Sequence, residues 1–303
     1  MKIWVPSQAA ADVLADLPGV ECAVFDGTGA PPDGLEEVEV WVPALIPFGD
    51  LANLIPRMTK LRLVQTISAG VDPYLPHIPE GVTLCNARGV HDAGTAEWAV
   101  GAMIAVLREF PHFVTEQREG VWAYRFTETL ADSTVLILGY GSIGEAVERR
   151  LAGFEVAEII RVARSARPGV HGQEELPRLL PRADVVVLLV PATSGTAGMV
   201  DAEFLARMKD GAVLVNAARG GVVDTDALLA ELTAGRLRAA VDVTAPEPLP
   251  PGHPLWSAPG IMITPHVAGS TPASQRRALK LIRSQILRYL SGEPLRNVIT
   301  GSY

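Results

Sequence analysis

The chain has 303 residues, of which 48% are hydrophobic and 20% charged, and its formal net charge is −8. That length suits two domains, each able to bury a core of its own. The acidic balance argues against a partner that is nucleic acid or a membrane surface, and no apolar run is long enough to span a bilayer. The opening residues "MKIWVPSQAA" lack the long apolar core of a signal peptide, so we expect a cytoplasmic protein.

Short apolar runs and helical stretches alternate over residues 1–86. Apolar residues have helical spacing in "SQAAADVLADL" and "DLANLIPRM". The two cysteines, Cys22 and Cys85, fall within apparent strands, so we interpret them as buried thiols and not as a disulfide or redox pair. The predicted strands, bounded by Pro, Gly or Asp, are "KIWV", "AVFD", "VEVWV", "LRLVQTI" and "VTLCN".

A long helical pattern follows over residues 93–120. Its apolar residues predict a buried helix, which Pro111 should kink or end because proline lacks an N–H and clashes with the preceding turn. Such a segment can bridge two domains. Another amphipathic helix is predicted near the C-terminus, with Thr271 as its N-cap and Pro272 at its first helical position.

A second series of strands begins near residue 134. Its apolar runs are continuous, which is typical of parallel strands covered on both faces. Helical stretches such as "SIGEAVERRLAG" and "DTDALLAELTAG" separate most of them, so this part of the chain predicts an α/β fold with a parallel sheet. The strands predicted here are Thr134–Leu138, Glu158–Val162, Asp184–Leu189, Ala212–Val215, Leu237–Val241 and Ile261–Thr264.

The first strand of this series leads directly into "GYGSIG", which has the spacing of a dinucleotide-binding loop. Gly139, Gly141 and Gly144 permit a tight turn and a close approach of the backbone to a pyrophosphate. The helix predicted from Ser142 offers free N–H groups and the positive end of its dipole. The alternative is a glycine-rich turn in an unrelated α/β domain, and the flanking strand and helix argue against it.

Chemically active side chains follow several of these strands. In a doubly wound parallel sheet, ligands bind beyond the carboxyl ends of the strands. Arg219 follows the fourth strand, Asp242 the fifth with Glu247 in the loop beyond it, and His266 the sixth. Singly, these residues fit a solvated loop, a helix cap or a hydrogen-bonded loop histidine, but their shared position favours one site. His253 lies outside this set and is interpreted as structural. Since no HExxH or CxxC pattern is present, we expect no metal site.

This set suits the reduction of a 2-keto acid to a 2-hydroxy acid with a nicotinamide cofactor. The planar guanidinium of Arg219 can hold the substrate carboxylate and polarise its carbonyl. A histidine side chain can donate a proton near neutral pH, so His266 can protonate the new alkoxide, and Glu247 can hold that imidazole. Backbone N–H groups in the glycine turn "SAGVD" (68–72) can bind the rest of the carboxylate.

These residues resemble the motifs of the D-isomer-specific 2-hydroxyacid dehydrogenases, which include glyoxylate/hydroxypyruvate reductases. The resemblance covers nearly the whole chain. It implies two doubly wound parallel-sheet domains with an active-site cleft between them: a flavodoxin-like substrate domain (1–94 and 270–303) and a Rossmann nucleotide-binding domain (95–269). It also implies homodimers formed through the nucleotide domain. The motifs are "SAGVD", "NARGVHDAGTAEW", "GYGSIG", "VPATSGTAGMV", "NAARGGVVD", "DVTAPEPLP", "HPLW" and "ITPHVAG".

The resemblance further implies roles for single residues. Arg219, Glu247 and His266 would be catalytic, and Ala69 and Gly70 would bind the substrate carboxylate through their backbone N–H groups. Besides the three glycines of the "GYGSIG" loop, the residues that would touch the cofactor are Thr95, Ser142, Ile143, Pro191, Thr196, Ala217, Asp242 and Gly269.

One departure from the family concerns the loop after the fifth strand of the second series. Thr244 and Ala245 stand where an aromatic residue and an acid are usual, while Glu247 is retained, so we expect altered loop packing with the activity intact.

We expect the substrate pocket wall to include residues 43–48 and residues near Trp122. Their apolar character argues against a phosphorylated substrate.

The adenosine end of the predicted site carries arginines in place of an acid. An NAD-binding domain usually has an Asp or Glu about 20 residues beyond the glycine loop, to bind the ribose hydroxyl. Arg164 stands there instead, with Ser165 beside it and Arg167 shortly after. A 2′-phosphate needs cations and hydroxyl donors, so we expect NADP(H) to be preferred, with NAD(H) possible. Arg161 falls inside the strand and is the weakest candidate. The alternative is that these are solvated arginines of an NAD enzyme.

Two other functions remain open from the sequence. One is a different oxidation on the same scaffold, of formate or phosphite, for which we find no added Asn or Lys signature. The other is a non-enzymatic, nucleotide-sensing corepressor, since relatives of this fold serve that way. The presence of Arg219, Glu247 and His266 disfavours the corepressor. A turnover assay separates these classes.

Overall fold

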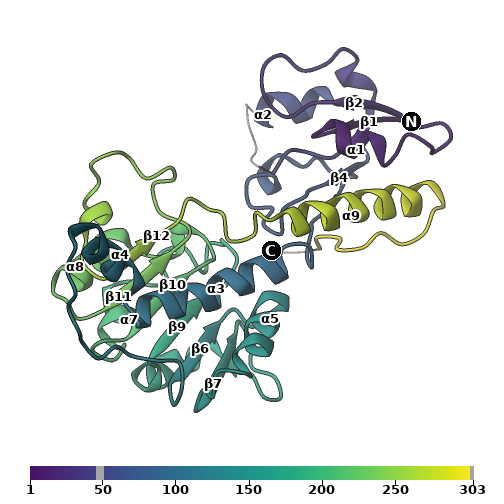
Figure 1. Cartoon of the computed structure of the whole chain (residues 1–303). Coiled ribbons are helices and arrows are strands. Elements are labelled where there is room, and N and C mark those ends of the chain that lie inside the picture. Colours follow the sequence, from purple (N-terminus) through teal and green to yellow (C-terminus); the bar gives the residue numbers. More distant parts are fainter. Residues whose placement is uncertain (46–50, 301–303) are drawn as a thin grey trace. The chain divides into compact units, whose positions relative to one another are not determined.

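The computed structural model describes residues 1–45 and 51–300, which form two compact units (Figure 1). The first unit comprises Met1–His91 with Pro272–Tyr303, and the second comprises Asp92–Thr271. Of the predicted pocket wall, residues 46–48 lie outside the described residues. No helix in the described ranges is both long and apolar enough to cross a membrane.

The described part of the first unit contains a parallel sheet with strand order β2-β1-β3-β4-β5. This is the flavodoxin-like order. On one face, Ile282 and Ile286 of the last helix pack into the same apolar cluster as Ile3 and Val5 of the first strand. The elements are β1 Lys2–Val5, α1 Gln8–Asp12, β2 Glu21–Val24, β3 Val38–Trp41, α2 Leu51–Leu54, β4 Leu63–Gln65, β5 Thr83–Cys85 and α9 Pro272–Leu290.

The structure tests the predicted start of the last helix and the predicted state of the two cysteines. The last helix begins at Pro272, as its sequence predicts. Both cysteines are free thiols. Cys85 is buried, but Cys22 is only partly buried, so the prediction of two buried thiols is wrong for Cys22. Its strand, β2, is the edge strand of the sheet, where a side chain has fewer neighbours to cover it.

In the second unit, all of whose residues are described, a parallel sheet has the order β12-β11-β10-β9-β6-β7-β8. This is a Rossmann sheet extended by one strand, and the chain reverses its direction of progress between β6 and β9. The strands are β6 Thr134–Leu138, β7 Glu158–Ala163, β8 His171–Gly172, β9 Val185–Leu188, β10 Val213–Asn216, β11 Arg238–Val241 and β12 Ile261–Ile263.

Helices cover both faces of this sheet, which explains the continuous apolar runs. Val135 and Ile137 pack with α3 and α5, while Leu136 and Leu138 pack with α7 and α8 on the other face (Figure 1). The helices are α3 Asp92–Leu107, α4 Phe110–Glu119, α5 Ser142–Leu151, α6 Leu176–Leu179, α7 Ala202–Ala206 and α8 Thr225–Thr233.

Two features of the second unit were only partly predicted. The long helical pattern is divided into α3 and α4 at Glu109, whose φ of 53° is left-handed. Pro111 lies in the first turn of α4 and would clash with the carbonyl of Leu107, where α3 ends, so the predicted break is confirmed. Strand β8 was missed because it has two residues and no apolar run. Its His171 is half-buried, with Nδ1 3.1 Å from Glu175 Oε1.

Candidate active site

The glycine loop passes close to the end of the neighbouring strand. Gly139 has a φ of +102°, and a Cβ placed on it would lie 2.5 Å from the carbonyl carbon of Leu189. A Cβ on Gly144 would lie 3.0 Å from Gly139 O and 3.2 Å from Ile137 Cγ2. Gly139 therefore allows the turn beside the end of β9, and Gly144 allows α5 to pack closely on β6.

The middle glycine faces open space instead. A Cβ on Gly141 would meet no atom within 4 Å. The helix α5 starts at the next residue, Ser142, and the side chain of Ile143 packs against the core. A bare backbone at a helix N-terminus, open on one side, fits the approach of a pyrophosphate. These glycines therefore fit a dinucleotide, with the same division of roles that a Rossmann fingerprint has.

The loops beyond the central strands are closed by internal hydrogen bonds. Thr196 Oγ1 donates to Pro191 O at 2.6 Å and accepts from Thr193 N at 2.9 Å, which closes the loop after β9. Ala217 N donates to Leu188 O at 3.2 Å. Two further predicted cofactor residues are Thr95, buried in α3, and Gly269, whose carbonyl accepts from Thr271 N at 3.2 Å.

The loop that carries Arg219 is fixed by two residues that the sequence did not single out. The buried Asn216 accepts from Ala218 N at 3.0 Å and donates from Nδ2 to Arg219 O at 3.2 Å. Gly220 lies against the next loop, since a Cβ there would be 1.9 Å from Thr244 O. Arg219 itself donates from Nη1 to Ala218 O at 2.8 Å. Gly220 thus lets the Arg219 loop lie against the segment that leads to Glu247.

His266 and Glu247 are brought into direct contact. Nδ1 of His266 lies 2.6 Å from Oε1 of Glu247, and the two side chains are 48% and 40% exposed. With Nδ1 on the carboxylate, Nε2 is the ring nitrogen left to face a ligand. An imidazole oriented by a carboxylate and accessible from solvent can exchange a proton with a small molecule.

The buried Asp242 fastens the loop on which His266 lies. Its carboxylate accepts from Thr264 Oγ1 at 2.5 Å, Val267 N at 2.9 Å and Ala268 N at 2.8 Å. Its carbonyl accepts from His266 N at 2.7 Å, and His266 has a left-handed φ of 55°. Asp242 therefore acts on the loop conformation. The predicted contact of Asp242 with the cofactor stays a prediction.

The arginines beyond β7 are placed differently from one another. Arg164, Ser165 and Arg167 are exposed. Arg161 is ion-paired with Glu148 of α5, with Nε 2.7 Å from Oε2. This pairing holds the pKa of the Glu148 carboxyl below its usual range and raises that of Arg161. The carboxylate thus balances the charge of Arg161.

In the first unit, Ala69 and Gly70 lie in the turn after β4. Asn86 Nδ2 donates to Ala69 O at 2.9 Å, and Ser68 Oγ donates to Gly70 O at 2.6 Å. Both carbonyls are thus held by side chains of their own unit, and the predicted substrate role of the N–H groups stays a prediction.

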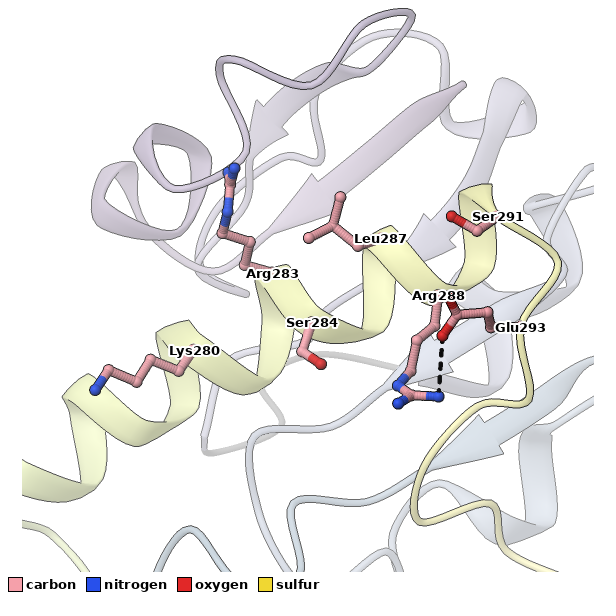
Figure 2. A pocket seen from close by; sticks show the side chains of 7 residues that line it. All are labelled: Lys280, Arg283, Ser284, Leu287, Arg288, Ser291 and Glu293. Atoms are coloured by element: carbon pink, nitrogen blue, oxygen red, sulfur yellow. Dashed lines mark ion pairs between the residues drawn. The ribbon is translucent and has the colours of Figure 1, made fainter.

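The remaining features mark structure more than chemistry. His253 caps a short turn, where its Nδ1 accepts from Leu255 N at 3.2 Å, so its structural interpretation is confirmed. A surface hollow in the first unit lies along α9 (Figure 2), where Arg288 and Glu293 form an ion pair of 3.3 Å. The hollow contains no predicted site residue; its lining residues are Lys280, Arg283, Ser284, Leu287, Arg288, Ser291 and Glu293.

Comparison with known proteins agrees with this architecture. Residues 100–268 match the family model of the D-isomer specific 2-hydroxyacid dehydrogenase, NAD binding domain. The chain is 31% identical to the mouse (Mus musculus) glyoxylate reductase/hydroxypyruvate reductase over 97% of its own length and 96% of the relative's. It is also 31% identical to an Archaeoglobus fulgidus D-3-phosphoglycerate dehydrogenase over 82% of its own length and 49% of the relative's.

A solved structure extends the likeness. The crystal structure of a D-isomer specific 2-hydroxyacid dehydrogenase from Xanthobacter autotrophicus Py2, in complex with NADPH and MES, has a TM-score of 0.84 and 31% identity, covering 99% of this chain and 98% of that one. The chain therefore belongs to the D-isomer specific 2-hydroxyacid dehydrogenase family. It is an oxidoreductase, and its second unit contains the family's NAD-binding domain.

Proposed function

We propose that the protein reduces a small 2-keto acid, such as glyoxylate or hydroxypyruvate, to the 2-hydroxy acid, which is the D-isomer wherever the product is chiral. The observation that carries this proposal is the 2.6 Å contact between His266 and Glu247, on a loop edge shared with Arg219 and the glycine loop. The mouse relative named above is a glyoxylate reductase/hydroxypyruvate reductase, which favours the same substrate class.

In this proposal the side chains bind the keto acid and supply its proton. Arg219 pairs with the substrate carboxylate and polarises the adjacent carbonyl. His266, protonated, donates its Nε2 proton to the carbonyl oxygen as the carbon is reduced, and Glu247 stabilises the imidazolium before that transfer. Bound NAD(P)H supplies the hydride, so one hydride and one proton convert the keto group to an alcohol.

The residues that would hold the cofactor are those of the loop edge. The open side of Gly141 and the N-terminus of α5 would take the pyrophosphate. We also propose a preference for NADPH, because Arg164, Ser165 and Arg167 are exposed beyond β7, where the adenosine ribose would bind and an acid would repel a 2′-phosphate. The complex of the Xanthobacter relative with NADPH supports this preference.

Initial rates test both parts of the proposal. Glyoxylate and hydroxypyruvate are each assayed with NADPH and with NADH. We expect turnover with at least one keto acid and a higher kcat/KM with NADPH. Turnover favouring NADH would keep the reductase and remove the cofactor preference. If neither keto acid is turned over, the proposed reductase activity is contradicted. Binding of NAD(H) without turnover would then favour the sensing role.

We further propose a homodimer formed through the second unit. Trp122, Tyr124 and Phe126 stand at alternate positions of the segment after α4, which is neither helix nor strand, and are 99%, 82% and 90% exposed. Large aromatic side chains exposed together mark an interaction surface, and a second copy of this chain is the occupant that family membership favours. Light scattering should give twice the 32.2 kDa chain mass. Replacing Trp122 and Phe126 by Ser should yield a monomer, and an unchanged mass in that variant would contradict the assignment.

A further inference from the structure

Tyr140 is the residue between the first two loop glycines. Two arginines, Arg161 and Arg167, lie near its ring. The guanidinium carbon of Arg161 is 5.8 Å from the ring centroid, and that of Arg167 is 5.9 Å from it. Both distances fall in the range where an aromatic ring attracts a cation. The two arginines differ in their other partners.

Arg161 is neutralised locally. Its Nε and Nη2 both donate to the carboxylate of Glu148, which also accepts a hydrogen bond from the Tyr140 hydroxyl. Since the carboxylate balances its charge, Arg161 is poorly suited to a phosphate. The same contacts fix the orientation of the Tyr140 ring, because its hydroxyl is bound to Glu148.

Arg167 is held in place without such a neutralising partner. Its Nη2 donates to the backbone carbonyl of Tyr140 at 2.6 Å. Its own backbone is fixed by a tight turn, in which Arg167 N donates to Val170 O at 2.9 Å and Val170 N donates to Arg167 O at 2.8 Å. In residues 1–45 and 51–300, no acidic side chain forms an ion pair with it. Arg167 is thus an exposed, ordered cation beside the glycine loop.

We propose that Tyr140 is a specificity-determining residue that positions Arg167 for the 2′-phosphate of NADP(H). The inference rests on the NADPH preference proposed above. The ring attracts the guanidinium and the Tyr140 carbonyl accepts from it, so Arg167 loses little conformational freedom when a phosphate binds. Substituting the ring by an aliphatic side chain keeps the carbonyl and removes the attraction to Arg167 together with the hydroxyl contact to Glu148. The loss of the attraction should weaken phosphate binding by about twofold to fivefold.

Calorimetric titration with two probes tests this role. Adenosine 2′,5′-bisphosphate carries the 2′-phosphate, and 5′-AMP does not. We expect Tyr140→Leu to raise Kd for the bisphosphate by about twofold to fivefold and to leave Kd for 5′-AMP unchanged. In an Arg167→Ala background, Tyr140→Leu should have no further effect, because the ring acts through Arg167. Tyr140→Phe, which keeps the ring, is the matched control and should bind both probes nearly as the wild type does.

The outcomes separate this proposal from the one it rests on. If the wild type binds the bisphosphate no more tightly than 5′-AMP, the NADPH preference itself fails and the role of Tyr140 fails with it. If Arg167→Ala weakens bisphosphate binding but Tyr140→Leu does not, the preference stands and the positioning role is overturned. Equal losses for both probes, or additive losses in the double variant, would also overturn it, since they would indicate a general disturbance of the loop.

Discussion

One methyl group at Gly220 should displace the loop that carries Arg219. A Cβ there would lie 1.9 Å from Thr244 O and 2.1 Å from the Thr244 carbonyl carbon, both backbone atoms. Non-bonded carbon and oxygen atoms do not approach so closely, so the two loops must separate by about 1 Å. A displacement of about 1 Å in a catalytic group can lower the rate about a hundredfold, which corresponds to about 2.7 kcal/mol in the barrier.

The neighbouring glycine provides a matched control. A Cβ on Gly221 would meet no atom within 4 Å, and neither glycine has the positive φ that strains other residues. We therefore expect Gly220→Ala to lower kcat/KM for hydroxypyruvate with NADPH by about a hundredfold, and Gly221→Ala to lower it by less than about threefold. Thermal melting and NADPH titration of both variants show whether the second unit remains folded. Equal kinetics in the two variants would refute the argument that the packing of these loops positions Arg219.

Four other results are expected. His266→Asn should lower kcat by about a hundredfold to ten-thousandfold in rate assays without weakening NADPH binding. Arg164→Asp should abolish or reverse the preference for NADPH over NADH, measured as the ratio of the two kcat/KM values. Gly139→Ala should lower the melting temperature, because its Cβ would lie 2.5 Å from backbone, whereas Gly141→Ala should leave it unchanged but weaken NADPH binding in a fluorescence titration. Burial raises the pKa of the Cys85 thiol to about 11, so at pH 8 the thiol stays protonated and should resist iodoacetamide, by mass spectrometry, until the chain is unfolded. An NADPH/NADH ratio that Arg164→Asp leaves unchanged, or rapid labelling of native Cys85, would contradict the respective argument.

The strand pattern predicted most of the fold because burial on both faces leaves a direct record in the sequence. The continuous apolar run of β6 divides its residues between two cores, and this is the pattern that a covered parallel strand requires. Strand β8 left no such record, since it pairs with β7 through only two residues. Cys22 was misjudged because a strand pattern does not reveal which strand lies at the edge.

The sequence predicted only those parts of the site whose position in space follows from their position after a strand. Residues that follow parallel strands must meet at one edge, so the pairing of His266 with Glu247 follows from their positions. Asn216 and Gly220 fix the Arg219 loop through contacts within that loop and with the Thr244 loop. The spacing of residues in the sequence does not predict such contacts. The strand-end position of Asn216, in "VNAARG", was the available sign that its amide could hold the loop.

The proposed reduction to the D-hydroxy acid depends on protonation of the 2-keto acid by His266. The most direct measurement is the rate and chirality of hydroxypyruvate reduction by the wild type and by His266→Asn, with NADPH in excess. We predict D-glycerate from the wild type and a rate at least about a hundredfold lower from the variant. Formation of L-glycerate, or an unchanged rate in the variant, would contradict the claim.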